Sequence, residues 1–491
     1  MPKDVIVVVQ RDAMPKQKES LDILLVSTTG ACPVAVYRDL ESVEAVYGPD
    51  GAAPNAKIVR KAATLLNQGK TTLADTLVRK FKIVGFDAPN ATPATAAKFI
   101  CEFPDGNMEY PLDAGTGIWV RVGGNDNVVL HAVTTAHTTK WRQMAALFGG
   151  MTFTMGGKTY TTASSGVTIT ATATEPGEAD TIPAVLNVYA DEGLTQEWPS
   201  EHTCQFINGT NEITGPQALV NTIKQFQSDI DNDWYYLMTD RDEPEYVKAL
   251  AKFAEASEPT EAELGAGVED HRKFYMGQTT DKTFVQATAR AAVIYTDPEF
   301  ISEEPDASYT GNVAPFYPNN VTWKFKRPQN GNAAETALIS LPQLKDSERD
   351  ALLENHINFL TEEYKRQYVK DGTCLDGEFI DVVLGGDWIA KRMRDLLYDL
   401  LLTNANIEYT DAGFGLIATA VLQALAEAVD LNIIARDQES RAGIFTVNIP
   451  KYSESTEEQR RNRVMPDITW EALLAGAVHQ VKAKGALRAS L

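Results

Sequence analysis

The stretch from Cys374 to Ala435 constrains the fold of this chain most strongly, because it contains two long helical patterns. The apolar run at residues 379–384 predicts a strand, and Asp387 is expected to cap the helix that follows. A second helix is expected after Thr410 and Asp411. Apolar residues recur in both helices at three- and four-residue steps, which predicts two antiparallel amphipathic helices beside a strand. The first stripe is Ile389, Met393, Leu396, Leu397, Leu400 and Leu401, and the second is Phe414, Ile417, Val421, Leu422, Leu425 and Val429.

Predicted strands and helices alternate over residues 21–88 and again over 206–310. Such units favour a partly parallel sheet flanked by helices, so these two segments are expected to form one discontinuous α/β domain. The expected fold class is α/β (mixed α+β) and multidomain. The predicted strands cover 21–28, 81–86, 234–239, 273–276 and 291–295, and the predicted helices cover 39–47, 56–67, 216–230, 244–256 and 283–290.

Residues 89–205 differ in composition from the segments on either side, because Thr, Ala and Gly dominate and turn signals are frequent. Short strands are predicted at 151–154, 159–162 and 167–174. This segment is expected to be a β-rich insertion on the exterior, and its residues do not indicate a function. Residues 311–465 are expected to form a separate C-terminal domain.

The chain has 491 residues, a formal charge of −22 and a pI near 4.8. This acidity argues against DNA or RNA as the main ligand, because phosphate binding needs a concentrated basic surface. The four cysteines lack Cys-x-x-Cys spacing, so reduced thiols are expected rather than a disulfide framework or a zinc site. No segment approaches the ~18 uninterrupted apolar residues of a membrane span.

Motifs for chemistry are weak. Gly69–Lys70–Thr71–Thr72 matches the end of a phosphate-binding loop, but Thr64 stands where that loop needs glycine, so a helix C-terminus at Gly69 is favoured. The segment 229–240 begins like a calcium loop, but Trp234 occupies its glycine position. None of the six histidines stands next to an obvious acid partner, although His131 and His137 could lie near each other. We therefore expect no cofactor, no metal and no enzymatic activity.

Both ends of the chain contain predicted strands on tethers. Val5–Val9 is a strongly β-favouring run followed by a polar, proline-containing stretch, and the sequence alternates from Val478 onward. Residues 1–20 and 466–491 are therefore interpreted as strand arms that pair with other copies of the chain. The alternative for the N-terminal strand is an edge strand within its own subunit. The proposed exchange residues are Val5, Ile6, Val7, Val8, Val9, Ala477, Val478, His479, Gln480, Val481, Lys482 and Ala483.

The C-terminal part resembles the tail sheath proteins of contractile bacteriophages, in a branch long known only as an uncharacterised phage family. The resemblance covers roughly residues 320–487, is weaker over 20–90 and 206–300, and is absent from the β-rich insertion. The segments that carry it are Asp376–Asp381, Gly386–Trp388, the paired helices that follow, Thr410–Gly413, Arg463–Pro466 and Leu474–His479.

This resemblance implies a subunit of six-fold rings stacked helically around a tail tube, held together by strands donated between neighbours. It implies the tube protein, the baseplate and the tail terminator as partners, and a place in the virion tail after assembly in the host cytoplasm. The alternatives are the sheath of a phage-derived bacteriocin or secretion machine, a tube or baseplate component, and a cytosolic α/β enzyme.

Overall fold

The computed structural model describes residues 22–68, 80–87, 91–123, 128–179, 183–195, 197, 202–260, 262, 271–317, 321–333, 337–477 and 479. The chain divides into two compact units. The first consists of residues 1–89 and 219–491, and the second of residues 90–218. The predicted strand at Val5–Val9 and the segment Gly69–Thr72 lie outside the described residues.

An eight-stranded sheet forms the centre of the first unit, in the order β18-β17-β16-β15-β14-β1-β3-β2. Its six inner strands are parallel, and the edge strands β2 and β18 are antiparallel to their neighbours. The strands are β1 (Ile23–Ser27), β2 (Cys32–Tyr37), β3 (Phe81–Gly85), β14 (Tyr236–Thr239), β15 (Phe274–Thr279), β16 (Ala291–Tyr295), β17 (Asn358–Glu363) and β18 (Arg366–Lys370).

Helices cover both faces of this sheet, which is why its central strands read as uninterrupted apolar runs. Ile23 and Leu25 face one core, whereas Leu24 and Val26 face the other, because successive side chains of a strand point to opposite sides. The first core also receives α1 (Leu40–Tyr47), α2 (Ala56–Leu66), α7 (Pro305–Val313) and the start of α9. The second receives α4 (Gly215–Asp229), α5 (Pro244–Glu255) and α8 (Asp346–Glu354). The short 3-10 helices η2 (Pro298–Glu303) and η3 (Ala314–Phe316) flank α7.

Two predictions for the first unit are wrong. The run 379–384 is not a strand, because a helix begins at Ile380 and buries Ile380 and Leu384 on one side. A short apolar run fits either structure, so its periodicity could not decide. Residues 283–290, predicted as a helix, have no regular structure. In addition, β17 and β18 lie within the range expected for the C-terminal domain but pair into the sheet of the body.

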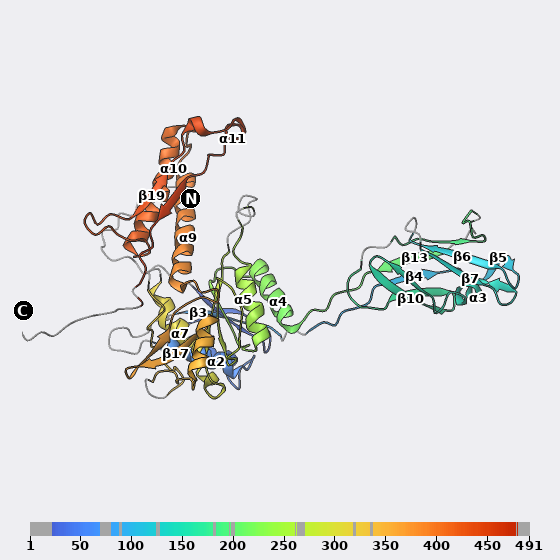
Figure 1. The fold of residues 1–491 in the computed structure, drawn as a ribbon, viewed down its shortest axis with the longest axis horizontal. Helices are drawn as coiled ribbons and strands as arrows, with labels where there is room; N and C mark the ends of the chain where they lie inside the picture. Colours follow the sequence, from blue (N-terminus) through green and yellow to red (C-terminus); the bar gives the residue numbers. More distant parts are fainter. Residues whose placement is uncertain are drawn as a thin grey trace, which may run out of the picture. The chain divides into compact units, whose positions relative to one another are not determined.

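The C-terminal arm, residues 380–477, contains the predicted helix pair. The helices α9 (Ile380–Thr403) and α10 (Asp411–Asp430) lie side by side (Figure 1), and Arg392 forms two hydrogen bonds with Glu427 between them. Thr410 caps α10 as predicted, by accepting from the Gly413 backbone N–H. The arm also contains β19 (Phe445–Asn448), η4 (Tyr452–Glu454), α11 (Glu457–Asn462) and β20 (Thr469–Ala472).

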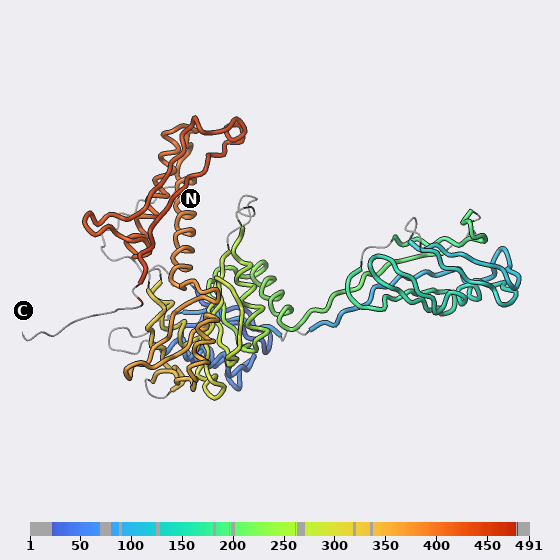
Figure 2. Tube along the Cα trace, viewed as in Figure 1, coloured from blue at the N-terminus to red at the C-terminus, as the bar shows by residue number. Residues whose placement is uncertain are grey.

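The second unit is β-rich, with sheets of five, three and two strands in the orders β13-β4-β11-β10-β9, β12-β6-β7 and β5-β8. Its elements are β4 (Lys98–Glu102), β5 (Asn107–Leu112), β6 (Gly117–Val122), β7 (Val128–Val133), β8 (Thr138–Lys140), α3 (Trp141–Ala146), β9 (Thr152–Met155), β10 (Lys158–Ser165), β11 (Thr168–Ala173), β12 (Leu186–Tyr189) and β13 (Thr203–Ile207). The two segments that enter and leave it run together (Figure 2), with bridges between Thr92 and Ile213 and between Thr95 and Thr210.

The expectation that all thiols are reduced is wrong for the second unit. Cys101 on β4 and Cys204 on β13 face each other directly in the antiparallel register and form a disulfide. The two residues are 103 positions apart in the chain, so their pairing depends on a strand register that cysteine spacing does not reveal. Cys32 and Cys374 are free thiols.

Candidate assembly surface

The two-stranded sheet of the C-terminal arm, β19 with β20, is the main candidate for a functional site. Phe445 and Val447 point inward to a small core formed by α9, α10 and the segment at Ile433, whereas Thr446 and Glu471 form a pair on the opposite face. In the part of the chain that the structure describes, each of these two strands has a sheet partner along one edge only. A two-stranded sheet is marginal by itself, so this sheet can accept further strands along either edge.

Large apolar side chains are exposed on the same arm. Of the 25 that are exposed among the described residues, 12 lie between Ile380 and Ala477 and 13 elsewhere. Leu402 is 81% exposed and Leu473 is 55% exposed. Exposed apolar residues gathered on one element mark a protein contact surface. They are Tyr398, Leu401, Leu402, Leu416, Leu422, Ile444, Ile449, Tyr452, Val464, Trp470, Leu473 and Leu474.

A buried ionic cluster fixes α9 to the body. Asp387 accepts hydrogen bonds from Arg290, Arg272 and Tyr235, which all belong to the α/β sheet or its connections. Asp387 was predicted to cap a helix, but it lies one to two turns inside α9 and points its carboxylate into this cluster. Burial lowers the pKa of Arg290, but the hydrogen bonds to Asp387 and the charges around the guanidinium together outweigh burial, and the net pKa is raised. The cluster holds the root of the helix rigidly.

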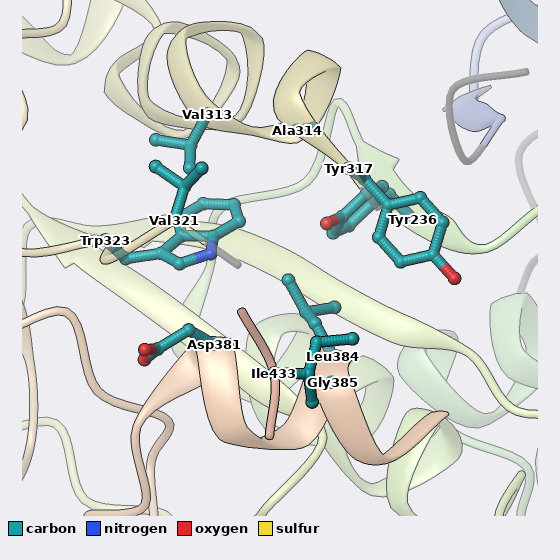
Figure 3. A pocket seen from close by; sticks show the side chains of 10 residues that line it. All are labelled: Tyr236, Val313, Ala314, Tyr317, Val321, Trp323, Asp381, Leu384, Gly385 and Ile433. Atoms are coloured by element: carbon teal, nitrogen blue, oxygen red, sulfur yellow. The ribbon is translucent and has the colours of Figure 1, made fainter. Parts of the chain in front are cut away.

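A narrow pocket lies beside this root (Figure 3). Its lining is mostly apolar, from Tyr236, Val313, Trp323, Leu384 and others, with one carboxylate from Asp381. Asp381 is 7% exposed, its Oδ1 atom has no hydrogen-bond partner, and burial raises its pKa. The chain passes closely here, because a Cβ atom added at Gly385 would lie 2.9 Å from Cγ2 of Ile433. The arm and the body therefore meet without space for a larger side chain at position 385.

The usual ligand position of an α/β sheet is filled by the protein's own side chains. That position is the carboxyl ends of β1 and β14. The strand order reverses between these two strands, because the chain continues from β1 to β2 and β3 on one side and from β14 to β15 on the other. There Asn55 donates to Asp240 at 2.6 Å, and Lys57 pairs with Asp242.

The buried Lys61 closes the same edge by pairing with Asp306 and Glu304. Burial raises the pKa of Asp306 to about 6 although Lys61 opposes the rise, so the carboxylate is ionised at neutral pH. Two lysines, Lys57 and Lys61, thus pair with three carboxylates inside the crevice.

A second buried lysine, Lys273, lies at the amino end of β15, near Trp234. Lys273 is 2% exposed, and its Nζ atom donates to the carbonyls of Asn232 and Trp234 and lies 4.0 Å from the centre of the Trp234 ring. Burial nevertheless lowers its pKa from 10.5 to about 7, against the opposing effect of Asp231.

We expect the free energy of unfolding to rise between pH 7 and pH 10 by up to ~1.4 kcal/mol per pH unit through Lys273. The unfolded chain regains an ordinary lysine and binds more protons in this range, which gives the rise its sign. Urea denaturation of the wild type and of Lys273→Met at several pH values measures it. Parallel stability curves for the two proteins would contradict the prediction.

The residues predicted for strand exchange are mostly outside the described residues. Ala477 is exposed and without regular structure. His479 contacts its own subunit, with Nε2 3.0 Å from Oγ1 of Thr322 and its ring against Phe379 at 4.7 Å between centroids. Val5, Ile6, Val7, Val8, Val9, Val478, Gln480, Val481, Lys482 and Ala483 lie outside the structure's described ranges.

Other sequence candidates have structural roles. Asp231, in the segment resembling a calcium loop, binds the ammonium of Lys82 at 2.8 Å. His131 stacks on Trp119. The expectation that no histidine has an acid neighbour is wrong for His137, which lies 3.1 Å from the carboxylate of Asp113 beside the paired ends of β5 and β8. Among the residues that the structure describes, no group of three or more His, Cys, Asp or Glu could hold a metal ion.

One helix departs from the expectation about membrane spans. By length and hydropathy alone, Asp411–Asp430, which is α10, could cross a membrane. Half of the apolar stretch is buried against the rest of the protein, as in the core helix of a soluble protein, and Glu427 pairs with Arg392.

Comparisons with known proteins give distant structural matches and no sequence matches. No protein-family model matches the chain, and no curated protein matches its sequence. The helical sheath of the anti-feeding prophage in its contracted state is similar over 98% of both chains, with 10% identity and a TM-score of 0.47.

Two further structures are components of the same kind of machine. A chain of the anti-feeding prophage baseplate is similar over 58% of this chain and 76% of its own, with 13% identity and a TM-score of 0.41. The contracted sheath complex of an extracellular contractile injection system, PVC, is similar over 55% of this chain and 75% of its own, with 12% identity and a TM-score of 0.40.

Proposed function

We propose that this chain is the structural subunit of a contractile tail sheath, which polymerises around the tail tube and contracts to drive the tube through the host envelope. One observation carries the proposal: the C-terminal arm presents a two-stranded sheet that packs on a small core. Among the described residues, each of its two strands has a partner strand on one edge only. The sheet can be completed by strands from other copies of the chain. The sequence resemblance supports the same reading.

The proposed donors are the two strand arms. Val5–Val9 is apolar throughout, which suits a strand buried on both faces between β-partners. In the C-terminal strand arm, residues 466–491, Val481 and Ala483 would join the inner face with Val447, and Lys482 would lie on the outer face with Glu471. Main-chain hydrogen bonds hold such a strand, and they persist while the domains that they connect change orientation.

The partners follow from this role. The subunit would form six-fold rings stacked helically, with the tail tube protein inside and with the baseplate and the tail terminator at the two ends. It would assemble in the host cytoplasm and stay in the virion tail. The exposed apolar side chains of the helices α9 and α10 suit a contact with the tube, and the β-rich insertion would face outward. The proposed domains are an α/β body of residues 21–88 and 206–310 completed by β17 and β18, the insertion 89–205, the remaining C-terminal region up to residue 465, and the strand arms 1–20 and 466–491.

The energy of contraction would be stored in a metastable extended lattice, so that no nucleotide is used. The acid–base pairs that fill the carboxyl edge of the sheet agree with this proposal. The sheath of a phage-derived bacteriocin or secretion machine is the second candidate, because the same arm and sheet would serve it equally. The genes that surround the coding sequence distinguish the two machines.

Negative-stain electron microscopy of the purified, concentrated protein tests the proposal. We expect hollow, striated cylinders, either from the protein alone or after co-expression with the tube protein. Compact monomers under both conditions would overturn the assignment as a sheath. Saturable binding of a nucleotide or a metal would favour a cytosolic α/β enzyme instead.

Charge reversal on the outer face of the arm sheet should weaken assembly. Glu471→Lys places a like charge opposite Lys482 of the donated strand, so we expect at least a tenfold rise in the protein concentration needed for cylinders. Glu439→Lys, an exposed site outside the sheet, is the matched control. Light scattering over a concentration series measures the threshold. Equal thresholds for the two variants would refute this pairing.

A further inference from the structure

We infer that the chain that follows β20 remains bound to its own subunit as far as His479. The strand given to a neighbour then begins at Gln480. This inference deepens the proposed function and rests on it. It divides the predicted exchange segment 477–483 into a retained part and a donated part. Two sets of contacts carry it, one along the backbone after β20 and one around the His479 ring.

The backbone after β20 is tied to its own subunit at successive positions. Leu473 donates to the carbonyl of Ile444 at 3.0 Å and accepts from the Ala435 N–H at 2.8 Å. Ala475 donates to the carbonyl of Ile433 at 3.0 Å, and Leu474 forms a bridge with Ile434. The chain that leaves β20 therefore extends the subunit's own sheet toward the root of α9. It does not leave the subunit at Ala472.

His479 is held four residues beyond the last of these bonds, in a set of side chains that we name the histidine seat: Thr322, Phe325, Phe379 and Asp381. The imidazole is 3.0 Å from the Thr322 hydroxyl and makes edge-to-face contacts with Phe379 and Phe325. Burial and the nearby Lys324 lower the pKa of His479, against the opposing charges of Asp381 and Asp371. All four side chains of the seat come from the body or from the start of α9, beside the pocket of Figure 3.

The ring contacts of the seat involve partly exposed side chains. With His479 in place, Phe325 and Phe379 are still 45% and 38% exposed. Phe325 adopts a positive φ of 63°, which is rare for a bulky residue, and its ring also contacts Tyr368 at 5.2 Å between centroids. The half-buried imidazole covers part of this apolar surface.

The seat also restricts the lattice. An extended chain spans at most ~3.3–3.6 Å per residue, so Val481 lies within ~7 Å of His479. For Val481 to enter the arm sheet of a neighbour, an open edge of that neighbour's β19–β20 sheet must lie next to the histidine seat. If the whole segment 477–483 were donated instead, the His479 contacts and the Ala475 hydrogen bond would have to break.

A cross-link that leaves His479 in place tests the inference in the full-length protein. Thr322→Cys with Ala477→Cys, in a Cys32→Ser background, would be joined by a short bifunctional thiol reagent after cylinders have formed. We expect the link within one chain, so the denatured protein runs as a monomer whose digest contains the linked peptides. Glu471→Cys with Lys482→Cys, treated in the same way, should give a ladder of linked multimers. A ladder from the 322–477 pair, or no link at all, would overturn the inference.

A second measurement does not depend on cylinders. Hydrogen exchange at the Ala475 amide should accelerate at least tenfold in His479→Ala, because the seat restrains this stretch, whereas His202→Ala should leave it unchanged. Equal rates in both variants would refute the seat. The unassembled subunit should already give the intrachain 322–477 link. If the protein gave the intrachain link but formed no cylinders, the proposed function would be wrong and the histidine seat would still be supported.

Discussion

Removal of residues 1–10 should abolish ordered cylinders while the monomer keeps its thermal stability. The deletion takes away Val5–Val9, the strand that we expect to enter a neighbour's sheet, and with it a row of main-chain hydrogen bonds at each subunit contact. A lattice held by such strands loses a link at every subunit, so the expected effect is complete loss of assembly. Electron microscopy measures assembly, and differential scanning calorimetry measures the monomer.

A point variant separates the strand from the length of the arm. Val7→Pro removes one donor and fixes φ in the middle of the predicted strand, so it should prevent assembly almost as completely as the deletion. Gln17→Pro, in the same tether but outside the predicted strand, should assemble normally. Normal cylinders from Val7→Pro would show that Val5–Val9 is an edge strand of its own subunit or plays no part in the lattice.

Loss of the Asp387 carboxylate should destabilise the folded subunit by about 3–5 kcal/mol, the usual range when one partner of a buried ion pair is removed. Arg290 is almost fully buried at 1% exposure, and Asp387→Ala would leave its guanidinium without its main partner. The neighbouring Arg272 and Tyr235 would also lose an acceptor. Urea denaturation of the dilute monomer measures this change.

Asp395→Ala is the matched control, because it removes an exposed carboxylate from the same helix. It should change the free energy of unfolding by less than ~0.5 kcal/mol. If Asp387→Ala unfolded with the same midpoint as this control, the cluster would not be what fixes α9 to the sheet.

Local patterns predicted most elements of the body. The runs at 21–28, 81–86 and 291–295 are uninterrupted because both faces of a parallel strand are buried, and all three contain strands. The stripes of α9 and α10 were equally visible, because helices packed on one side keep a fixed period. The prediction for 379–384 failed because a run of five apolar residues and one aspartate fits either a strand or a buried helical turn.

The contacts that define the candidate site were not predictable in the same way. Asp387 looked like a helix cap, because its partners Arg290 and Tyr235 are about 100 and 150 positions away in the chain. The same holds for His479, whose contact with Thr322 spans 157 positions. Such pairs depend on the tertiary arrangement. The one hint in the sequence of the His479 contact was the aromatic residue Phe379, which precedes the apolar stripe of α9.

The way in which the second unit joins the chain has a consequence for engineering. Its entry and exit segments pair through antiparallel bridges between Thr92 and Ile213 and between Thr95 and Thr210. The first and last residues of the inserted unit are therefore adjacent. A foreign domain whose own termini are close together could replace residues 97–207 without stretching the chain on either side. The subunit thus carries a natural cassette site, at which an epitope or an enzyme could be displayed in a repeating array.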